Sequence, residues 1–268
     1  MEETRERFSE RLGYSALDKP IVIRDGAPTE IRTAIIHFAL DAGLRPESIR
    51  SLILHTLGVP PEPDLWSSES NIIKESQRHL DRAEWFEVYD VAEEIYRHFL
   101  RRAPQRSEKF AEQLNRVFLR QGVGWKIDDG IVESRGSEAF ETQLAAAKEA
   151  LHAVGLQVAR TEVHESLRDL SRRPEPDLTG ALQHAAAALE CVAREASGRR
   201  TATLGQILQS DRHLFPPPLG DALEKLWGFA SERARHVREG GTLAREEAEL
   251  VVGIAAGAVT YLCRKLTS

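Results

Sequence analysis

The chain has 268 residues, of which 41% are hydrophobic and 29% are charged, proportions that are typical of a folded globular protein and exclude a disordered or fibrous one. Because this length exceeds that of a usual single domain, two domains are expected. The net charge of -6 argues against a protein that coats nucleic acid with its whole surface, so any nucleic-acid recognition has to be local.

The N-terminus is charged and no apolar run follows it, so we expect no export signal and a cytoplasmic protein. The longest apolar stretch, residues 250–263, is about two thirds of a membrane span and is interpreted as a core helix. Cys191 and Cys263 lie on apolar faces of predicted helices, which favours buried free thiols over a disulfide. No His and Cys spacing indicates a metal site and no glycine-rich loop indicates a phosphate site, so neither a metal nor a cofactor is expected.

Apolar residues at intervals of three and four predict helices along the first 120 residues. The segments are about 28–42, 46–57, 70–80, 83–102 and 107–120. Before them, residues 21–23 favour a short strand. Trp66, Trp85 and Trp125 are expected in the core of this part of the chain.

Residues 122–135 interrupt the helical pattern. Val123, Trp125 and Ile127 alternate with small or charged residues, and Asp129-Gly130 follows as a turn. Because both central positions of a two-residue hairpin turn need positive φ, this pair predicts a β-hairpin.

Helical patterns return after the hairpin, at about 137–153, 158–171, 177–197, 219–239 and 244–264. The predicted fold is mostly α, with a helical N-terminal domain at residues 1–155 that carries the hairpin and a helical bundle at residues 156–268. The strongest break between helical patterns is the proline-rich and charged run SRRPEPD at 171–177.

The helix at 219–239 carries the most distinctive chemistry. Its apolar face repeats through Leu219, Leu223, Leu226 or Trp227, and Ala230. Its C-terminal end carries a group that we call the basic cluster, namely Arg233, Arg235, His236 and Arg238. Gly240 and Gly241 then end the helix.

Two groups of motifs resemble known proteins. Residues 174–238 resemble the C-terminal HEPN domain (higher eukaryotes and prokaryotes nucleotide-binding) of AbiJ-type abortive-infection proteins. The matching positions are Glu190, Thr203-Leu204-Gly205, Gly228-Phe229-Ala230-Ser231 and Arg235-His236. Residues 7–140 resemble an AbiJ N-terminal domain through RFSERLGY at 7–14 and GVGWKIDDGIVESRGSEAFE at 122–141.

This resemblance implies a phage-defence protein whose bundle is a metal-independent endoribonuclease that works as a homodimer, under the control of the N-terminal domain. His236 would act as acid or base, with Arg235 or Arg233 on the phosphate. The predicted substrate-binding residues are Arg238, Ser231 and Glu190.

In active relatives four to six residues separate the Arg from the His, and this chain departs from that spacing. Arg235 is adjacent to His236 and points about 100° away from it on a helix, whereas Arg233, three positions back, shares its face.

Two alternatives therefore stay open. Cations gather at helix C-termini because the helix dipole and free carbonyls favour them, and the bundle can instead be a non-catalytic dimerisation module that binds RNA, a nucleotide or a protein. Glu190 fits the role of a partner for an Arg better than that of a catalytic acid, and His184 is expected to be a surface or lightly packed residue.

Overall fold

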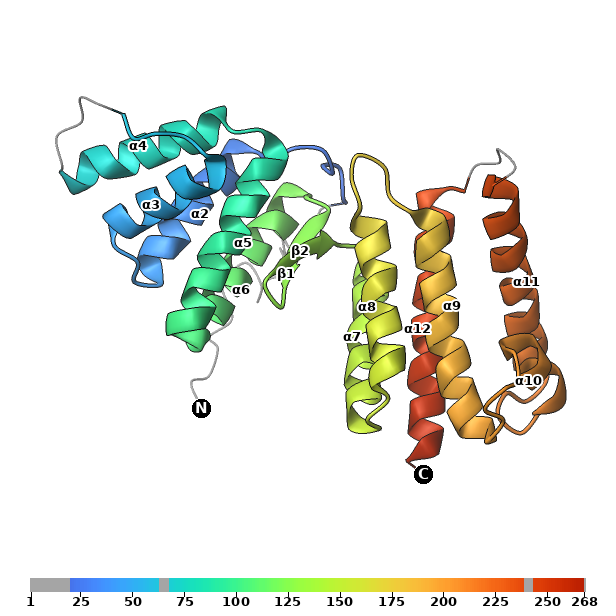
Figure 1. Cartoon of the computed structure of the whole chain (residues 1–268). Coiled ribbons are helices and arrows are strands. Elements are labelled where there is room, and N and C mark those ends of the chain that lie inside the picture. The colour runs from blue at the N-terminus through green and yellow to red at the C-terminus, as the bar shows by residue number, and fades with distance from the viewer. Residues whose placement is uncertain (1–19, 63–67, 239–242, 268) are drawn as a thin grey trace, which may run out of the picture. The chain divides into compact units, whose positions relative to one another are not determined.

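The computed structural model describes residues 20–62, 68–238 and 243–267, and for residues 233–238 it describes only the helix backbone. The described residues form helices α2 to α12 and one small two-stranded sheet (Figure 1). The predicted mostly α fold class is therefore confirmed. Contacts between residues divide the chain into two compact units, residues 1–135 and 136–268.

The division between the units falls after Arg135, at the end of the hairpin, whereas the sequence-based division falls after residue 155. Between these points lies α7 (Glu138–Ala153), which packs along α12 (Arg245–Leu266) and contributes to the core of the second unit. This pairing joins segments about a hundred residues apart, so no local signal reveals it.

The break at residues 171–177 is a connection within the second unit. It joins α8 (Gln157–Ser171) to α9 (Leu178–Ser197), and these two helices pack against each other. Asp177 in this loop caps α9 by accepting a hydrogen bond of 2.7 Å from the backbone N–H of Gly180. Proline and charge here mark a tight turn between neighbouring helices and not a domain boundary.

The first unit contains five described helices that match the predicted ones closely. They are α2 (Thr29–Asp41), α3 (Pro46–Leu57), α4 (Glu69–Arg82), α5 (Trp85–Arg102) and α6 (Pro104–Gln121). Proline begins α3 and α6, and a glycine with positive φ follows each of them, which are the usual start and stop residues of helices. Their apolar faces meet in one core with the hairpin.

The hairpin consists of β1 (Trp125–Asp128) and β2 (Ile131–Ser134), paired antiparallel. Asp129 and Gly130 have φ values of 49° and 80°, so the predicted turn is confirmed. Asn115 on α6 holds the hairpin, because its side chain makes two hydrogen bonds of 2.8 Å to the backbone of Ile127.

The segment before α2 also contacts the hairpin region. Ile23 makes one parallel bridge to Val123, so the strand expected at 21–23 is reduced to a single pair. Trp125 is buried and Trp85 packs against it in the core, as predicted. Trp66 lies outside the described residues.

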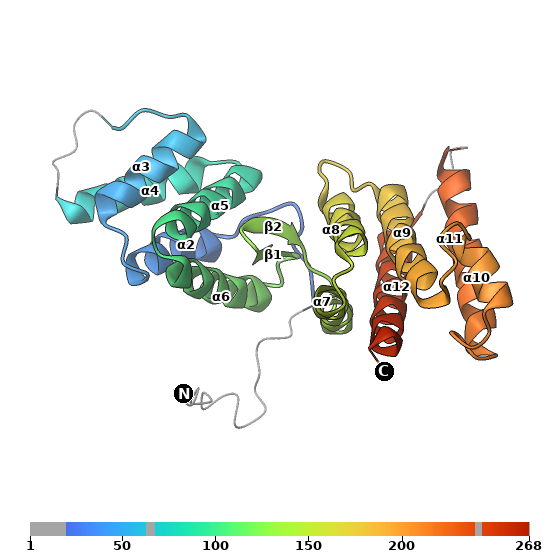
Figure 2. The ribbon, with the colours of Figure 1, turned by 60° about the horizontal axis from the view of Figure 1, so that its bottom comes forward.

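The second unit is built from α7 to α12 (Figures 1 and 2). Helix α12 packs between α7 and α9, and α8 packs on α9 and α7. The short helix α10 (Leu204–Ser210) and the long helix α11 (Leu219–Arg238) pack on the other side of α9.

Helix α12 is the core helix that the apolar stretch predicts, with most of residues 251–263 buried. Cys263 is buried and Cys191 is half-buried, both as free thiols, and burial raises the pKa of each thiol. Within the part of the chain that the structure describes, no helix combines the length and apolar character that crossing a membrane requires.

Candidate functional site

Two of the motifs that carry the resemblance meet at the start of α10. The backbone N–H of Leu204 donates a hydrogen bond of 2.8 Å to Oε2 of Glu190 on α9. The other carboxylate oxygen of Glu190 lies 2.6 Å from Nη2 of Arg194, and Nε of Arg194 donates to the carbonyl of Ala202 at 2.7 Å. Glu190 therefore has the Arg partner expected for it, and the pair fixes α10 on α9.

Thr203 completes this arrangement as the N-cap of α10. Its hydroxyl accepts a hydrogen bond of 3.3 Å from the backbone N–H of Gln206, and the Gln206 side chain accepts one of 3.0 Å from the backbone N–H of Thr203. This reciprocal capping box satisfies backbone donors that a helix start leaves free. The Thr-Leu-Gly turn and Glu190 thus have a structural function that is independent of any catalysis.

The basic cluster lies in the last two turns of α11, and the helix backbone continues through Arg238. The side chains of Arg233, Arg235, His236 and Arg238 lie outside the described part of the structure. Of the other predicted site residues on this helix, Ser231 is exposed and follows the buried Ala230.

Glu190 and the backbone of the basic cluster lie at different heights along the axis of α11. Leu223 near the start of α11 lines a small cavity together with Leu189 and Leu204, and α11 leads away from α10 (Figure 1). From position 223 to position 236 the helix rises about 20 Å. The fold therefore brings Ser231 and the basic cluster into neighbouring turns and does not bring Glu190 to them.

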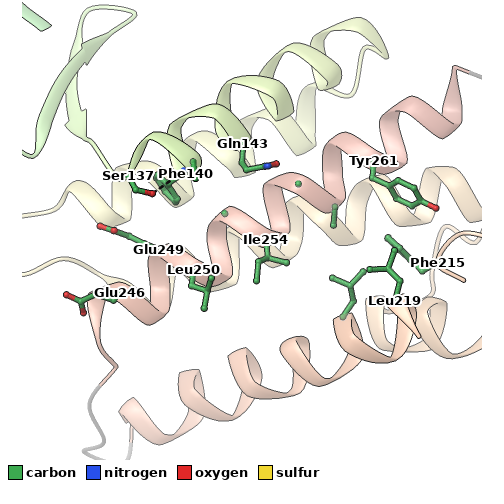
Figure 3. A pocket seen from close by; sticks show the side chains of 15 residues that line it. Ser137, Phe140, Gln143, Phe215, Leu219, Glu246, Glu249, Leu250, Ile254 and Tyr261 are labelled. Atoms are coloured by element: carbon green, nitrogen blue, oxygen red, sulfur yellow. Dashed lines mark hydrogen bonds between the residues drawn. The ribbon is translucent and has the colours of Figure 1, made fainter. Parts of the chain in front are cut away.

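A groove that sequence reasoning did not find runs along α12 (Figure 3). We call it the α12 groove; its volume is about 650 Å³, and it lies between α7, α12 and the segment 215–223. Most of its lining is apolar. Of the residues predicted for the RNA site, the two whose side chains the structure describes, Glu190 and Ser231, do not line it.

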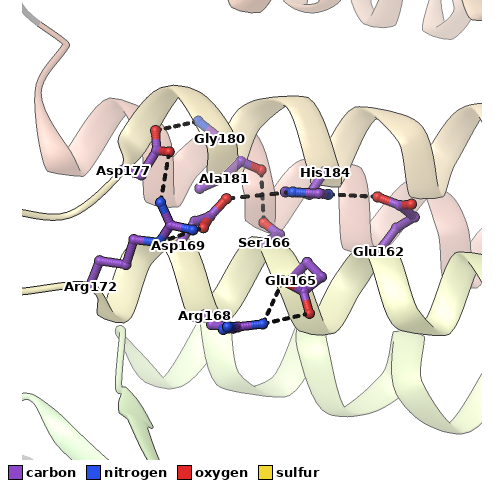
Figure 4. A network of polar contacts seen from close by, with 10 residues as sticks. All are labelled: Glu162, Glu165, Ser166, Arg168, Asp169, Arg172, Asp177, Gly180, Ala181 and His184. Atoms are coloured by element: carbon purple, nitrogen blue, oxygen red, sulfur yellow. Dashed lines mark hydrogen bonds and ion pairs between the residues drawn. The ribbon is translucent and has the colours of Figure 1, made fainter.

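His184 lies in a polar network between α8 and α9 (Figure 4). Its Nδ1 is 2.7 Å from Oε2 of Glu162, and its Nε2 is 3.6 Å from Oδ2 of Asp169. The side chain of His184 is 37% exposed, which agrees with the surface or lightly packed residue expected here, and it lies between two carboxylates of the neighbouring helix.

Asp169 is the buried member of this network. Burial raises the pKa of its carboxyl group, while the nearby Arg172 and His184 partly offset that rise. Arg172 Nε lies 3.2 Å from Oδ1 of Asp169. Since His184 is on α9 and both Glu162 and Asp169 are on α8, these contacts join the two helices.

Among the described residues, no three His, Cys, Asp or Glu side chains gather as metal ligands.

Residues 6–150 match the sequence profile of the family described as AbiJ N-terminal domain 4. The matched region covers more than half of the chain, and the chain belongs to this family. AbiJ membership suggests an abortive-infection, phage-defence context. No curated protein and no solved structure matches the chain. The family match ends inside α7, so it includes the first helix of the second unit.

Proposed function

We propose that this chain is an antiviral defence protein in which an AbiJ N-terminal domain controls a HEPN-type endoribonuclease in the second unit. The family membership of residues 6–150 supports the defence context. The observation that carries the enzymatic part is the helical backbone of α11 through Arg238, since it sets positions 233 and 236 one turn apart.

The reaction that fits these residues is RNA cleavage by the RNA's own 2′-hydroxyl. A base removes the 2′ proton, the 2′ oxygen attacks the adjacent phosphorus, and the bond from phosphorus to the 5′ oxygen breaks. An acid then supplies a proton to the leaving 5′ oxygen. His236 can act as base or acid near neutral pH, and Arg233 or Arg235 can offset the charge that grows on the phosphate.

A second copy of the chain would complete this site, because cleavage needs one base and one acid and each chain contributes one His236. We place the contact between copies in the C-terminal bundle. Arg238 and Ser231 would hold the RNA beside the reacting phosphate.

The alternative function is a non-catalytic module that dimerises and binds RNA, a nucleotide or a protein through the basic cluster. One observation favours it. In active relatives four to six residues separate the Arg from the His, and the positions at that spacing before His236 hold Phe229, Ala230 and Ser231. The expected Arg is therefore absent.

The test is cleavage of a mixed RNA pool by the purified full-length protein in the presence of a chelator. We expect the native protein to leave 2′,3′-cyclic phosphate ends and His236→Ala to lose cleavage by at least 100-fold. His213→Ala is the matched control, because His213 is an exposed histidine of the same unit. Light scattering checks that all three proteins have the same oligomeric state.

Equal cleavage by the native protein and His236→Ala would remove the enzymatic proposal, as would the absence of cleavage by both. Loss of RNA binding in Arg235→Ala and Arg238→Ala, measured by filter binding without cleavage, would then support the binding module.

A further inference from the structure

The α12 groove is a surface that the proposed ribonuclease does not use (Figure 3). Its walls are the first half of α7 and the segment 215–223, and its floor is one face of α12. The apolar side chains and glycines of this floor are Leu250, Gly253, Ile254, Gly257, Ala258 and Tyr261. They recur every three to four residues, so one continuous stripe of the helix faces the groove.

Two glycines set the depth of the groove where α7 approaches α12. A Cβ at Gly257 would lie 2.9 Å from Oε1 of Gln143, and one at Gly253 would lie 3.4 Å from a ring carbon of Phe140. Leu250 is 61% exposed and Ile254 is 37% exposed, although both are large apolar side chains.

The charged residues of the described lining lie at one end of the groove. They are Glu246 and Glu249, both in the first turns of α12, and this described lining contains no Lys or Arg. Glu249 pairs with Arg245 at 2.9 Å, while Glu246 is exposed. At the other end the hydroxyl of Tyr261 donates to the carbonyl of Leu214 at 2.9 Å.

The length of the stripe matches that of a helix. From Glu246 to Tyr261 the helix α12 rises about 22 Å, which equals a partner helix of about 15 residues lying alongside it. Grooves of this kind take an amphipathic helix through apolar side chains at i, i+3 or i+4, and i+7. A basic residue at one end of that helix would complement the acidic end of the groove.

We propose that the α12 groove is the docking site for an amphipathic helix of a partner protein. The partner helix places a row of apolar side chains against Leu250, Ile254 and Leu219, and a Lys or Arg beside Glu246. This inference does not depend on the ribonuclease proposal, because the residues that carry it lie on α12 and in the segment 215–223.

The test uses a labelled synthetic helix of 16 residues with leucines on one face and two lysines in its last turn. Fluorescence anisotropy measures its binding to the full-length protein. We expect Leu250→Asp and Ile254→Asp to raise the Kd at least tenfold. Leu266→Asp is the matched control, because Leu266 is similarly exposed at 38% on the same helix but does not line the groove.

Charge reversal tests the complementarity. Glu246→Lys should weaken binding of the lysine-ended helix and strengthen binding of a counterpart in which both lysines are glutamates. A peptide of the same composition whose leucines do not share a face should not bind.

Two results would overturn the proposal. One is that the lysine-ended helix does not bind the native protein, or binds it and Leu250→Asp with equal Kd. The other is a native dimer that becomes monomeric in Leu250→Asp and not in Leu266→Asp by sedimentation, because the occupant would then be a second copy of the chain.

Discussion

Glu190 on α9 and Leu204 at the start of α10 are joined by a hydrogen bond of 2.8 Å from the Leu204 backbone N–H to Oε2 of the carboxylate. The first N–H groups of a helix have no partner within it, and a negative charge there also interacts favourably with the helix dipole. Because α11 follows α10 and packs on both α10 and α9, this link helps to position the helix that carries the basic cluster.

We expect Glu190→Ala to destabilise the second unit by about 1–3 kcal/mol, the usual cost of removing a hydrogen bond to a charged group. Hydrogen exchange of the Leu204 amide should become faster, which NMR or mass spectrometry can measure. Glu195→Ala is the control, because Glu195 is exposed on the same helix. An unchanged exchange rate together with lost RNA cleavage would instead support the substrate-binding role that the resemblance implies for Glu190.

The first unit contains a fully buried carboxylate, that of Glu75, and its stability should depend on the partners of this group. Its Oε2 lies 3.2 Å from Nη1 of Arg50, and its Oε1 accepts a hydrogen bond of 2.7 Å from the backbone N–H of Glu62. Arg50→Met leaves a buried charge without its main cation, so we expect a loss of about 3 kcal/mol. Urea unfolding measures this loss.

A double-mutant cycle measures the interaction energy between Arg50 and Glu75. Arg50→Met combined with Glu75→Leu should be less destabilised than the sum of the two single variants, because the buried charge is gone. Additive effects would mean that Arg50 and Glu75 do not depend on each other.

Local signals made the helices and the hairpin predictable. Proline at the starts of α3 and α6, glycine after them, and Asp129-Gly130 between alternating residues each act over a few positions. The same signals do not indicate where the two compact units divide, because the pairing of α7 with α12 leaves no local trace.

The candidate site, too, was predictable from the sequence only in part. The sequence indicates the basic cluster at the end of α11 and an Arg partner for Glu190, since both depend on spacing along one helix. It could not indicate that His184 lies between Glu162 and Asp169, or that Gly253 and Gly257 open a groove, because these features depend on which faces of separate helices meet.

Gly180 allows the close approach of Asp169 to the start of α9. A Cβ at this position would clash with Oδ2 of Asp169 and would lie 2.8 Å from Oδ2 of Asp177. We expect Gly180→Ala to destabilise the second unit by about 1–3 kcal/mol, since it displaces a buried carboxylate or the N-cap of α9. Hydrogen exchange of the α8 and α9 amides is the measurement.

Gly228→Ala is the matched control, because Gly228 is also helical and a Cβ there meets nothing within 4 Å. In that position Ala should stabilise α11 by about 0.5–1 kcal/mol, the normal preference of a helix for Ala over Gly. Changes of the same sign in both variants would contradict the steric explanation for Gly180.

Tyr96 should make the first unit sensitive to alkaline pH. Burial, together with a hydrogen bond of 2.7 Å from its hydroxyl to Oε1 of Glu108, raises the pKa of Tyr96 to about 12. In the unfolded chain the pKa of Tyr is about 10, so deprotonation favours unfolding. The stability due to the neutral phenol is complete below about pH 10 and is lost as the pH rises through about 12.

Tyr96→Phe cannot ionise, so its stability should fall less steeply over this range. The free-energy advantage of the native protein over Tyr96→Phe should shrink by about 2 kcal/mol between pH 9 and pH 12, because the unfolded Tyr ionises through this range while the folded Tyr is only half ionised at pH 12. Urea unfolding at each pH, followed by Trp fluorescence, measures this advantage. Comparing the two proteins cancels the contribution of Tyr89, whose pKa burial also raises. A constant advantage across the range would show that Tyr96 ionises equally in the folded and unfolded chains.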